Sequence, residues 1–118
     1  MINGITVNQV YLVSGFTDMR KAINGLSMIV SEQLEHDPFS GQVFVFCNRQ
    51  RNKLKILYWE HNGFWLYYRS LAKGKFKWPM QYNSQTLPLT LRELQWLLDG
   101  LAYTQKQAHV EVKGLKNN

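Results

Sequence analysis

Two β-type segments, residues 53–60 and 64–71, flank the dipeptide Asn62-Gly63 near the middle of the chain. Asn-Gly between two such segments is the strongest short-range hairpin signal, because a type I′ turn needs positive φ at both central residues. Glycine adopts positive φ without steric cost. We therefore predict an antiparallel hairpin with Asn62 and Gly63 as its turn, and this pairing limits the possible folds more than any other feature of the sequence.

The predicted turn also fixes which side chains share a face of the hairpin. Trp59 is expected to lie opposite Leu66. Side chains alternate between the faces along each strand, so Lys53 and Lys55 point to one side and Arg69 to the other. Cations on this hairpin therefore cannot form one flat patch on a sheet face, and we expect them to gather at a rim.

The N-terminal half predicts a strand, a helix and a second strand. Residues 7–14 are rich in β-branched and aromatic types, which favours a strand. Apolar residues at helical spacing predict a helix from near Met19, capped by Thr17 or Asp18, that ends before the turn DPFSG. The apolar run at residues 43–47 predicts a buried strand.

The C-terminal half carries a clear helix signal. Lysines alternate with apolar residues along 73–78, which favours a further strand of the meander, and residues 80–88 are expected to form a loop. Thr90 and Glu93 then form a capping box, and Gly100 marks the end of an amphipathic leucine-rich helix.

Consecutive strands joined by short turns indicate an α+β class. We predict a small antiparallel sheet of about four to five strands, with a central hairpin meander, packed with an N-terminal and a C-terminal helix. A chain of 118 residues suits a single domain, which we place at residues 1–103. Residues 104–118 are polar and are expected to form a flexible tail.

Positive charge is concentrated in one part of the sequence. The chain has a formal net charge of +6, and in residues 49–77 Glu60 is the single acidic residue. A basic stretch of this kind is typical of a polyanion-binding surface, and the alternative is a solvated face that keeps the protein soluble. The candidate phosphate contacts are Arg49, Arg51, Lys53, Lys55, Arg69, Lys73, Lys75 and Lys77.

Arg20 and Lys21 add a second candidate site for nucleic acid. They fall in the first turn of the predicted N-terminal helix, where the helix dipole disfavours cations. An anionic ligand or an acidic partner would explain this placement. The alternative is that both side chains point into water at small cost.

Aromatic residues interleave with this charge at Trp59, Trp65, Tyr67 and Tyr68. Exposed rings on a sheet can stack on unpaired nucleic-acid bases. The same rings are favoured in strands as core residues, and tryptophan and tyrosine are also common anchors of protein interfaces. The sequence leaves these three roles open.

Catalytic and metal-binding constellations are missing from the sequence. The three aspartates fit cap, turn and helix-end roles, and the histidines have no ligand spacing. A metal-dependent nuclease needs several convergent carboxylates. Cys47 lies in an apolar run, where a lone thiol is more often a small core residue than a nucleophile. We predict that the chain is not an enzyme and binds neither metal nor cofactor.

No apolar run approaches the ~18–20 residues of a membrane span. The beginning of the chain, MINGITVNQVYLVSGF, has no basic segment and no cleavage site of a secretory signal. We expect a cytoplasmic protein without a membrane partner, and the oligomeric state stays open.

Three segments carry a resemblance to a known family: GFTDMRKAINGL, the stretch from DPFSGQVFVFCNRQRNKLKILYWEHNGFWLYY to KGKFKWP, and LTLRELQWLLDGL. They are similar to the insertion-sequence 66 accessory protein, the TnpB-type product of the second open reading frame in these bacterial transposons. The resemblance covers about Val10 to Leu101. It implies a protein that assists transposition beside a separate, larger transposase, with no catalytic activity of its own.

Charge and resemblance together favour a non-catalytic accessory protein that binds DNA through a basic rim. Contacts would be mainly to phosphates, so we expect weak sequence preference. The alternative is a protein-interaction module that docks the transposase or another accessory protein without touching DNA.

Overall fold

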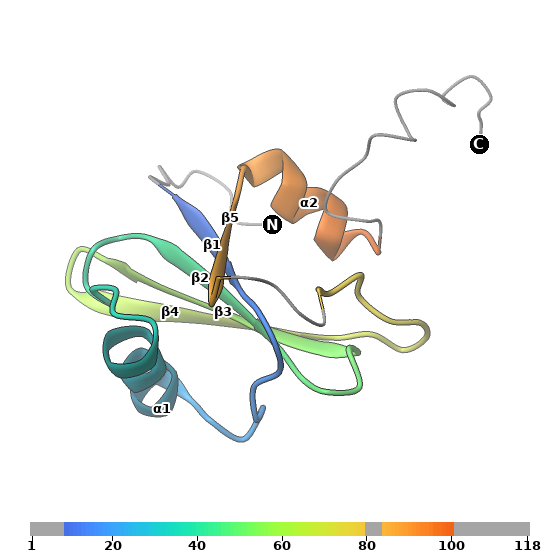
Figure 1. The fold of residues 1–118 in the computed structure, drawn as a ribbon, viewed down its shortest axis with the longest axis horizontal. Helices are drawn as coiled ribbons and strands as arrows, with labels where there is room; N and C mark the ends of the chain where they lie inside the picture. The colour runs from blue at the N-terminus through green and yellow to red at the C-terminus, as the bar shows by residue number, and fades with distance from the viewer. Residues whose placement is uncertain (1–8, 80–83, 101–118) are drawn as a thin grey trace.

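The computed structural model describes residues 9–79 and 84–100. A five-stranded sheet in the order β4-β3-β2-β1-β5 forms the centre, with α1 against one face and α2 against the other (Figure 1). The predicted α+β class is confirmed. The elements are β1 (Val10–Val13), α1 (Ile23–Met28), the π-helical turn η1 (Ile29–Gln33), β2 (Val43–Cys47), β3 (Lys53–Glu60), β4 (Gly63–Ser70), β5 (Thr86–Leu89) and α2 (Leu91–Leu98).

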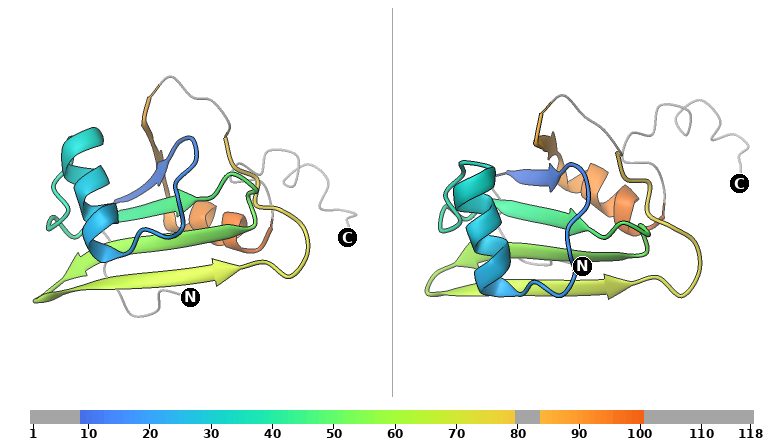
Figure 2. Two further views of the ribbon diagram at one scale, coloured as in Figure 1. Left: turned by 90° about the horizontal axis from the view of Figure 1, so that it is seen from below. Right: turned by 60° about the horizontal axis from the view of Figure 1, so that its bottom comes forward.

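The sheet is mixed rather than wholly antiparallel. Strands β1 and β2 are parallel, with Val10 opposite Val43, whereas the other three pairs are antiparallel. Parallel neighbours need a crossover connection, and α1 with η1 provides it by returning the chain along one face of the sheet (Figure 2).

Strand β5 overlaps the end of the predicted loop over residues 80–88. Residues 86–89 pair antiparallel with β1, with Leu12 opposite Leu87. The sequence TLPL is short and contains Pro88, which an edge strand tolerates because one side of the strand makes no ladder bonds. The local signal is weak, so pairing with β1 decides the conformation.

The predicted strand over residues 73–78 is wrong, but its alternation is present. Phe76 and Trp78 are buried, while Lys73, Lys75 and Lys77 are exposed. Residues 71–79 form no strand, because this segment packs its two aromatic side chains into the core as an irregular chain.

Two hydrophobic cores lie on opposite faces of the sheet. One lies under α2 and includes Val45, Ile56 and Leu97. The other lies under α1 and includes Phe44 and Leu57. Every residue of β2 is buried, so this central strand contributes to both cores.

The β3–β4 hairpin forms, but its turn lies one residue earlier than predicted. Glu60 pairs with Gly63, so His61 and Asn62 make the turn, and His61 has the positive φ of 58°. Gly63 begins β4 outside the left-handed region. Trp59 therefore faces Phe64 rather than Leu66, and the two rings pack at 5.0 Å.

This aromatic contact gives a physical reason for the observed register, because aromatic pairs directly across two strands are favourable. The observed partner of Trp59 is two residues away from the predicted one. Side chains alternate between the faces, so a shift of two residues leaves every side chain on its predicted face. Lys53 and Lys55 still lie on the α1 face and Arg69 on the α2 face.

Helix α2 begins as predicted. The Glu93 amide donates to Thr90 Oγ1 at 3.0 Å, and the Thr90 amide donates to Glu93 Oε1 at 2.7 Å. Leu94, Leu97 and Leu98 are buried, and Gly100 has φ 83° at the end. Leu101 and the predicted tail over 104–118 lie outside the described residues.

The position of the turn predicts opposite effects on stability for substitutions at His61 and at Gly63. His61→Val should lower the free energy of unfolding by about 1–2 kcal/mol, because a β-branched residue resists positive φ. Gly63→Ala should be neutral or raise it by about 0.5 kcal/mol, since glycine weakens a strand and nothing lies within 4 Å of the added Cβ. Urea unfolding of both variants measures this. A larger loss at Gly63 than at His61 would place the turn at residues 62–63.

Candidate nucleic-acid interface

Three loops meet at one end of the sheet, where β1, β2 and β4 end and β3 begins (Figure 2). Backbone hydrogen bonds join them: Thr17 N–H donates to Cys47 O at 2.7 Å, Leu71 N–H to Asn52 O at 2.8 Å, and Phe76 N–H to Arg51 O at 2.6 Å. We call this the basic end, defined as residues 14–22, 48–52 and 71–79 with the strand-end residues Lys53 and Arg69.

The Asn48 side chain shapes the β2–β3 loop. Its Oδ1 accepts from the amides of Asn52 and Lys53, both at 3.0 Å, and its Nδ2 donates to Asn52 Oδ1 at 2.8 Å and to Gln50 Oε1 at 3.3 Å. Asn48 is 9% exposed. This role was not predicted from the sequence, although a polar residue directly after an apolar strand is a signal for a side chain that caps the loop.

Two predicted contact residues project from that loop. Arg49 is exposed, and its guanidinium carbon lies 5.4 Å from the centroid of the Phe16 ring. Arg51 has a positive φ of 62°, an uncommon conformation for a side chain of this size. A hollow of about 330 Å³ opens beside Arg49 and is also lined by Thr17 and Asn48.

The lysines of residues 71–79 face away from the protein because the residues between them are anchored. Phe76 is fully buried, and the Trp78 indole Nε1 donates to Gly15 O at 2.9 Å. Lys73, Lys75 and Lys77 are exposed and have no partner among the described residues.

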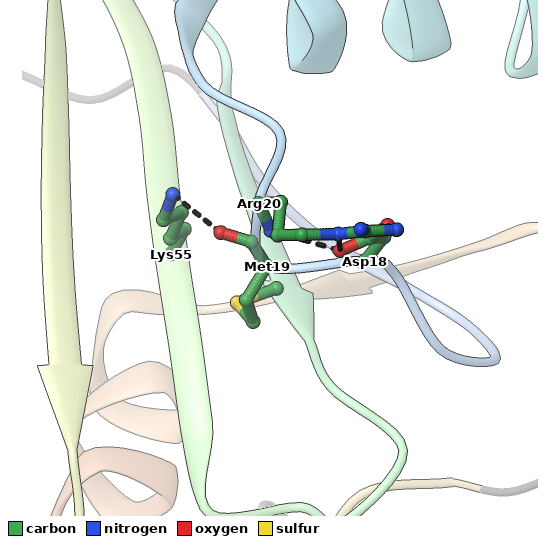
Figure 3. A network of polar contacts seen from close by, with 4 residues as sticks. All are labelled: Asp18, Met19, Arg20 and Lys55. Carbon is green, nitrogen blue, oxygen red and sulfur yellow. Dashed lines mark hydrogen bonds and ion pairs between the residues drawn. The ribbon is translucent and has the colours of Figure 1, made fainter.

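Lys55 has a structural contact that the sequence did not indicate. Its ammonium group donates to the carbonyl oxygen of Met19 (Figure 3) and to that of Lys21, both at 2.8 Å. It also lies 5.7 Å from the centroid of the Tyr68 ring. Lys55 thus holds the β1–α1 loop onto β3, and two of its three N–H donors are used within the protein.

The prediction that Arg20 and Lys21 lie in a first helical turn is wrong, because α1 begins only at Ile23. The Asp18 carboxylate accepts from the Arg20 amide at 2.9 Å and pairs with the Arg20 guanidinium at 2.7 Å (Figure 3). A local turn of this kind competes with helix. Lys55 also holds the carbonyls that a longer helix would need as acceptors. The dipole argument for an anion at Arg20 and Lys21 therefore no longer applies.

The four aromatic candidates lie in different environments. Trp59 is partly buried between Phe39 and Phe64. Tyr67 stacks between Tyr58 and Trp65, with ring centroids 6.2 and 6.1 Å apart. The exposed rings are Trp65, at 49%, and Tyr68, at 54%.

The described residues contain no group of three or more His, Cys, Asp or Glu side chains that could hold a metal ion. Cys47 is fully buried in β2, and this burial raises the pKa of its thiol to about 12. The thiolate is the nucleophilic form, so Cys47 is a core residue rather than a reactive one. No described helix is long and apolar enough to cross a membrane.

Comparison with known proteins places these features in a family context. The profile of the family described as "IS66 Orf2 like protein" matches residues 8–108. "Uncharacterized protein y4hO" of Sinorhizobium fredii (strain NBRC 101917 / NGR234) is 30% identical over 99 residues, covering 84% of this chain and 85% of that protein. "Uncharacterized protein y4jC" of the same organism is 33% identical over 88 residues, covering 75% and 74%. No solved structure gives a significant match.

Removal of the Asn48 side chain should loosen the loop that carries Arg49 and Arg51. Asn48→Ala leaves the amides of Asn52 and Lys53 without their acceptor, so we expect a loss of about 2 kcal/mol in the free energy of unfolding. Gln50→Ala is the matched control, because it removes a single 3.3 Å contact and should change stability by less than ~0.5 kcal/mol. Equal effects in urea unfolding would show that Asn48 does not organise the loop.

The Asp18–Arg20 pair should be visible in a titration. Hydrogen bonds from the Arg20 side chain and amide lower the pKa of Asp18 to about 2. Because this pKa is depressed on folding, its contribution to stability is present above about pH 4 and is lost as the pH falls towards 2. Arg20→Ala should move the carboxyl midpoint, followed by NMR, up towards 3.8. An unmoved midpoint would mean that the pair does not form in solution.

Proposed function

The chain belongs to the IS66 Orf2-like family, whose members are accessory proteins of insertion elements, and from this membership we propose that it acts in transposition as a non-catalytic protein that binds DNA through the basic end. The observation that carries the proposal is the gathering of cations from three loops at one end of the sheet. These loops hold seven Lys and Arg residues and one carboxylate, Asp18, which Arg20 already neutralises.

The basic end suits phosphate contacts because the loops that carry its cations are held in place before a ligand arrives. Hydrogen bonds fix the loops around Asn48 and Trp78, so less conformational entropy is lost on binding. The proposed phosphate contacts exclude Lys55, whose ammonium group is engaged with backbone carbonyls. They also leave out Arg20, which pairs with Asp18, and Lys21, whose predicted place in a helical turn is not observed. The proposed contacts are Arg49, Arg51, Lys53, Arg69, Lys73, Lys75 and Lys77.

The positions of the cations favour contacts to the DNA phosphates over contacts that recognise the bases. The cations lie on a rim, where loops and strand ends meet, and no described helix presents them as a unit that could enter a major groove. Phosphate contacts position a protein on DNA without reading sequence, so we expect similar affinity for transposon-end and random duplexes.

Docking to the transposase or another accessory protein is the second candidate. The observation that favours it is the exposure of Phe39, Trp65 and Tyr68, at 57%, 49% and 54%. Exposed aromatic rings are common anchors of protein interfaces. Co-purification with the transposase that survives nuclease treatment would support docking, and loss of the complex on nuclease treatment would support the DNA proposal.

Salt dependence tests the DNA proposal quantitatively. If the basic end neutralises ~4–6 phosphates, log K should fall with log salt at a slope of about −4 to −5. Lys73→Ala with Lys75→Ala should make the slope shallower by about 2 and weaken binding to all sequences equally. Gel-shift titrations at several salt concentrations measure both effects.

The matched control is Arg92→Ala, which removes an exposed cation from the first turn of α2. That turn follows Leu89, which pairs with Val10 at the far end of β1 from the basic end. Arg92→Ala should leave the slope unchanged. Equal losses per removed cation in the two variants would show non-specific charge attraction, and no binding to single- or double-stranded DNA at low salt would end the proposal.

A further inference from the structure

The two edges of the sheet differ in how they are protected. Strand β5 forms one edge, is four residues long and contains Pro88. Strand β4 forms the other edge, is eight residues long, and its sequence GFWLYYRS contains no proline, lysine or acidic residue. Natural edge strands are usually short or carry such residues, which block pairing with another chain. Apart from the charge of Arg69 near its end, the outer side of β4 lacks this protection, and no described strand covers it.

The outer side of β4 presents a regular set of backbone groups. The Leu71 amide donates to Asn52 O, in continuation of the β3–β4 register, so odd-numbered residues of β4 bond to β3. The even-numbered residues therefore turn their N–H and C=O groups outward. These residues are Phe64, Leu66, Tyr68 and Ser70.

Charge along this edge is self-complementary. Arg69 lies near the end of β4. Glu60, the last residue of β3, lies opposite Gly63 at the start of β4, and the Trp65 indole donates to the Glu60 carboxylate at 2.8 Å. By the strand alternation, Glu60, Trp65 and Arg69 share the α2 face. An antiparallel copy of the same strand would therefore bring each Arg69 towards the Glu60 end of the other.

We propose that β4 pairs antiparallel with β4 of a second copy of this chain, giving a symmetric dimer with one continuous sheet. With Tyr67 at the twofold axis, Arg69 lies opposite Trp65 of the second copy, whose indole holds the Glu60 carboxylate on the same face. The even-numbered residues of the two strands then exchange hydrogen bonds. Such a contact uses the same surface on both copies, so it closes at two subunits.

The net charge of +6 does not oppose this arrangement strongly. With Tyr67 at the twofold axis, the Ser70 residues of the two copies lie six positions apart along the shared pair of strands, roughly 20 Å, so the two basic ends lie at its opposite ends. That separation exceeds the Debye length of ~8 Å at physiological salt. Parallel pairing in register would instead place the two Arg69 side chains side by side, so the antiparallel orientation is favoured.

Sedimentation of the full chain without DNA, over a concentration series, tests the proposal independently of the proposed function. The wild-type chain should show a reversible dimer. Arg69→Glu should raise the dimer dissociation constant about tenfold or more, because it opposes Glu60 of the second copy. Combination of Arg69→Glu with Glu60→Arg should restore the dimer. The matched control is Arg92→Glu, with the same change in charge on α2, and it should leave the dimer intact.

A backbone variant supplies a second test. Tyr68→Pro removes an outward N–H and no β3–β4 bond, so it should abolish the dimer, whereas Tyr68→Ala keeps the amide and should weaken it less. Circular dichroism checks that the variants fold, and if Tyr68→Pro does not, the charge swap decides. A single-chain mass at every concentration would overturn the proposal. A dimer unaffected by Arg69→Glu would equally overturn it, because another surface would then form the contact.

Discussion

Strand β2 is buried on both of its faces, with Phe44 and Phe46 against the α1 side and Val45 and Cys47 against the α2 side. A central strand of this kind needs apolar cover above and below, so the middle of the sheet offers no place for solvated charge. Solvated cations are therefore confined to loops and strand ends, and Lys55, inside β3, donates to backbone carbonyls instead. The basic end is in this sense a consequence of how the two cores are built.

The loops at the basic end are held by polar side chains rather than by apolar packing alone. Asn48 satisfies the amides of the β2–β3 loop, and Lys55 satisfies two carbonyls of the β1–α1 loop. Arg51 keeps a left-handed conformation there, which costs of order 1–3 kcal/mol in general and persists where surrounding contacts enforce it. The bond from Phe76 N–H to Arg51 O is one of those contacts.

Features with a strong local signal could be predicted from the sequence. The Thr90 capping box depends on residues three apart, and the β3–β4 faces depend on simple alternation. Features decided by distant partners could not. The start of α1 depends on Lys55, which lies 34 residues after Lys21 in the sequence. Strand β5 forms because β1 offers an open edge. The exact turn at His61 reflects cross-strand packing of aromatic rings, which the Asn-Gly signal does not encode. At the candidate site the cations of the rim were predictable, but the organising role of Asn48 was not.

Arg69 connects the two proposals, because it lies both near the basic end and on the edge of β4. In the dimer its guanidinium would be directed towards Trp65 and Glu60 of the second copy, and a cation engaged with a carboxylate contributes little to phosphate neutralisation. Phosphate binding would then rest on the two loops beyond the strand ends, which carry Arg49, Arg51 and the three lysines of residues 71–79. These loops lie past the last residue of β4, so strand pairing leaves them free. The two copies would hold their basic ends at opposite ends of the shared pair of strands, and each could meet a separate segment of DNA.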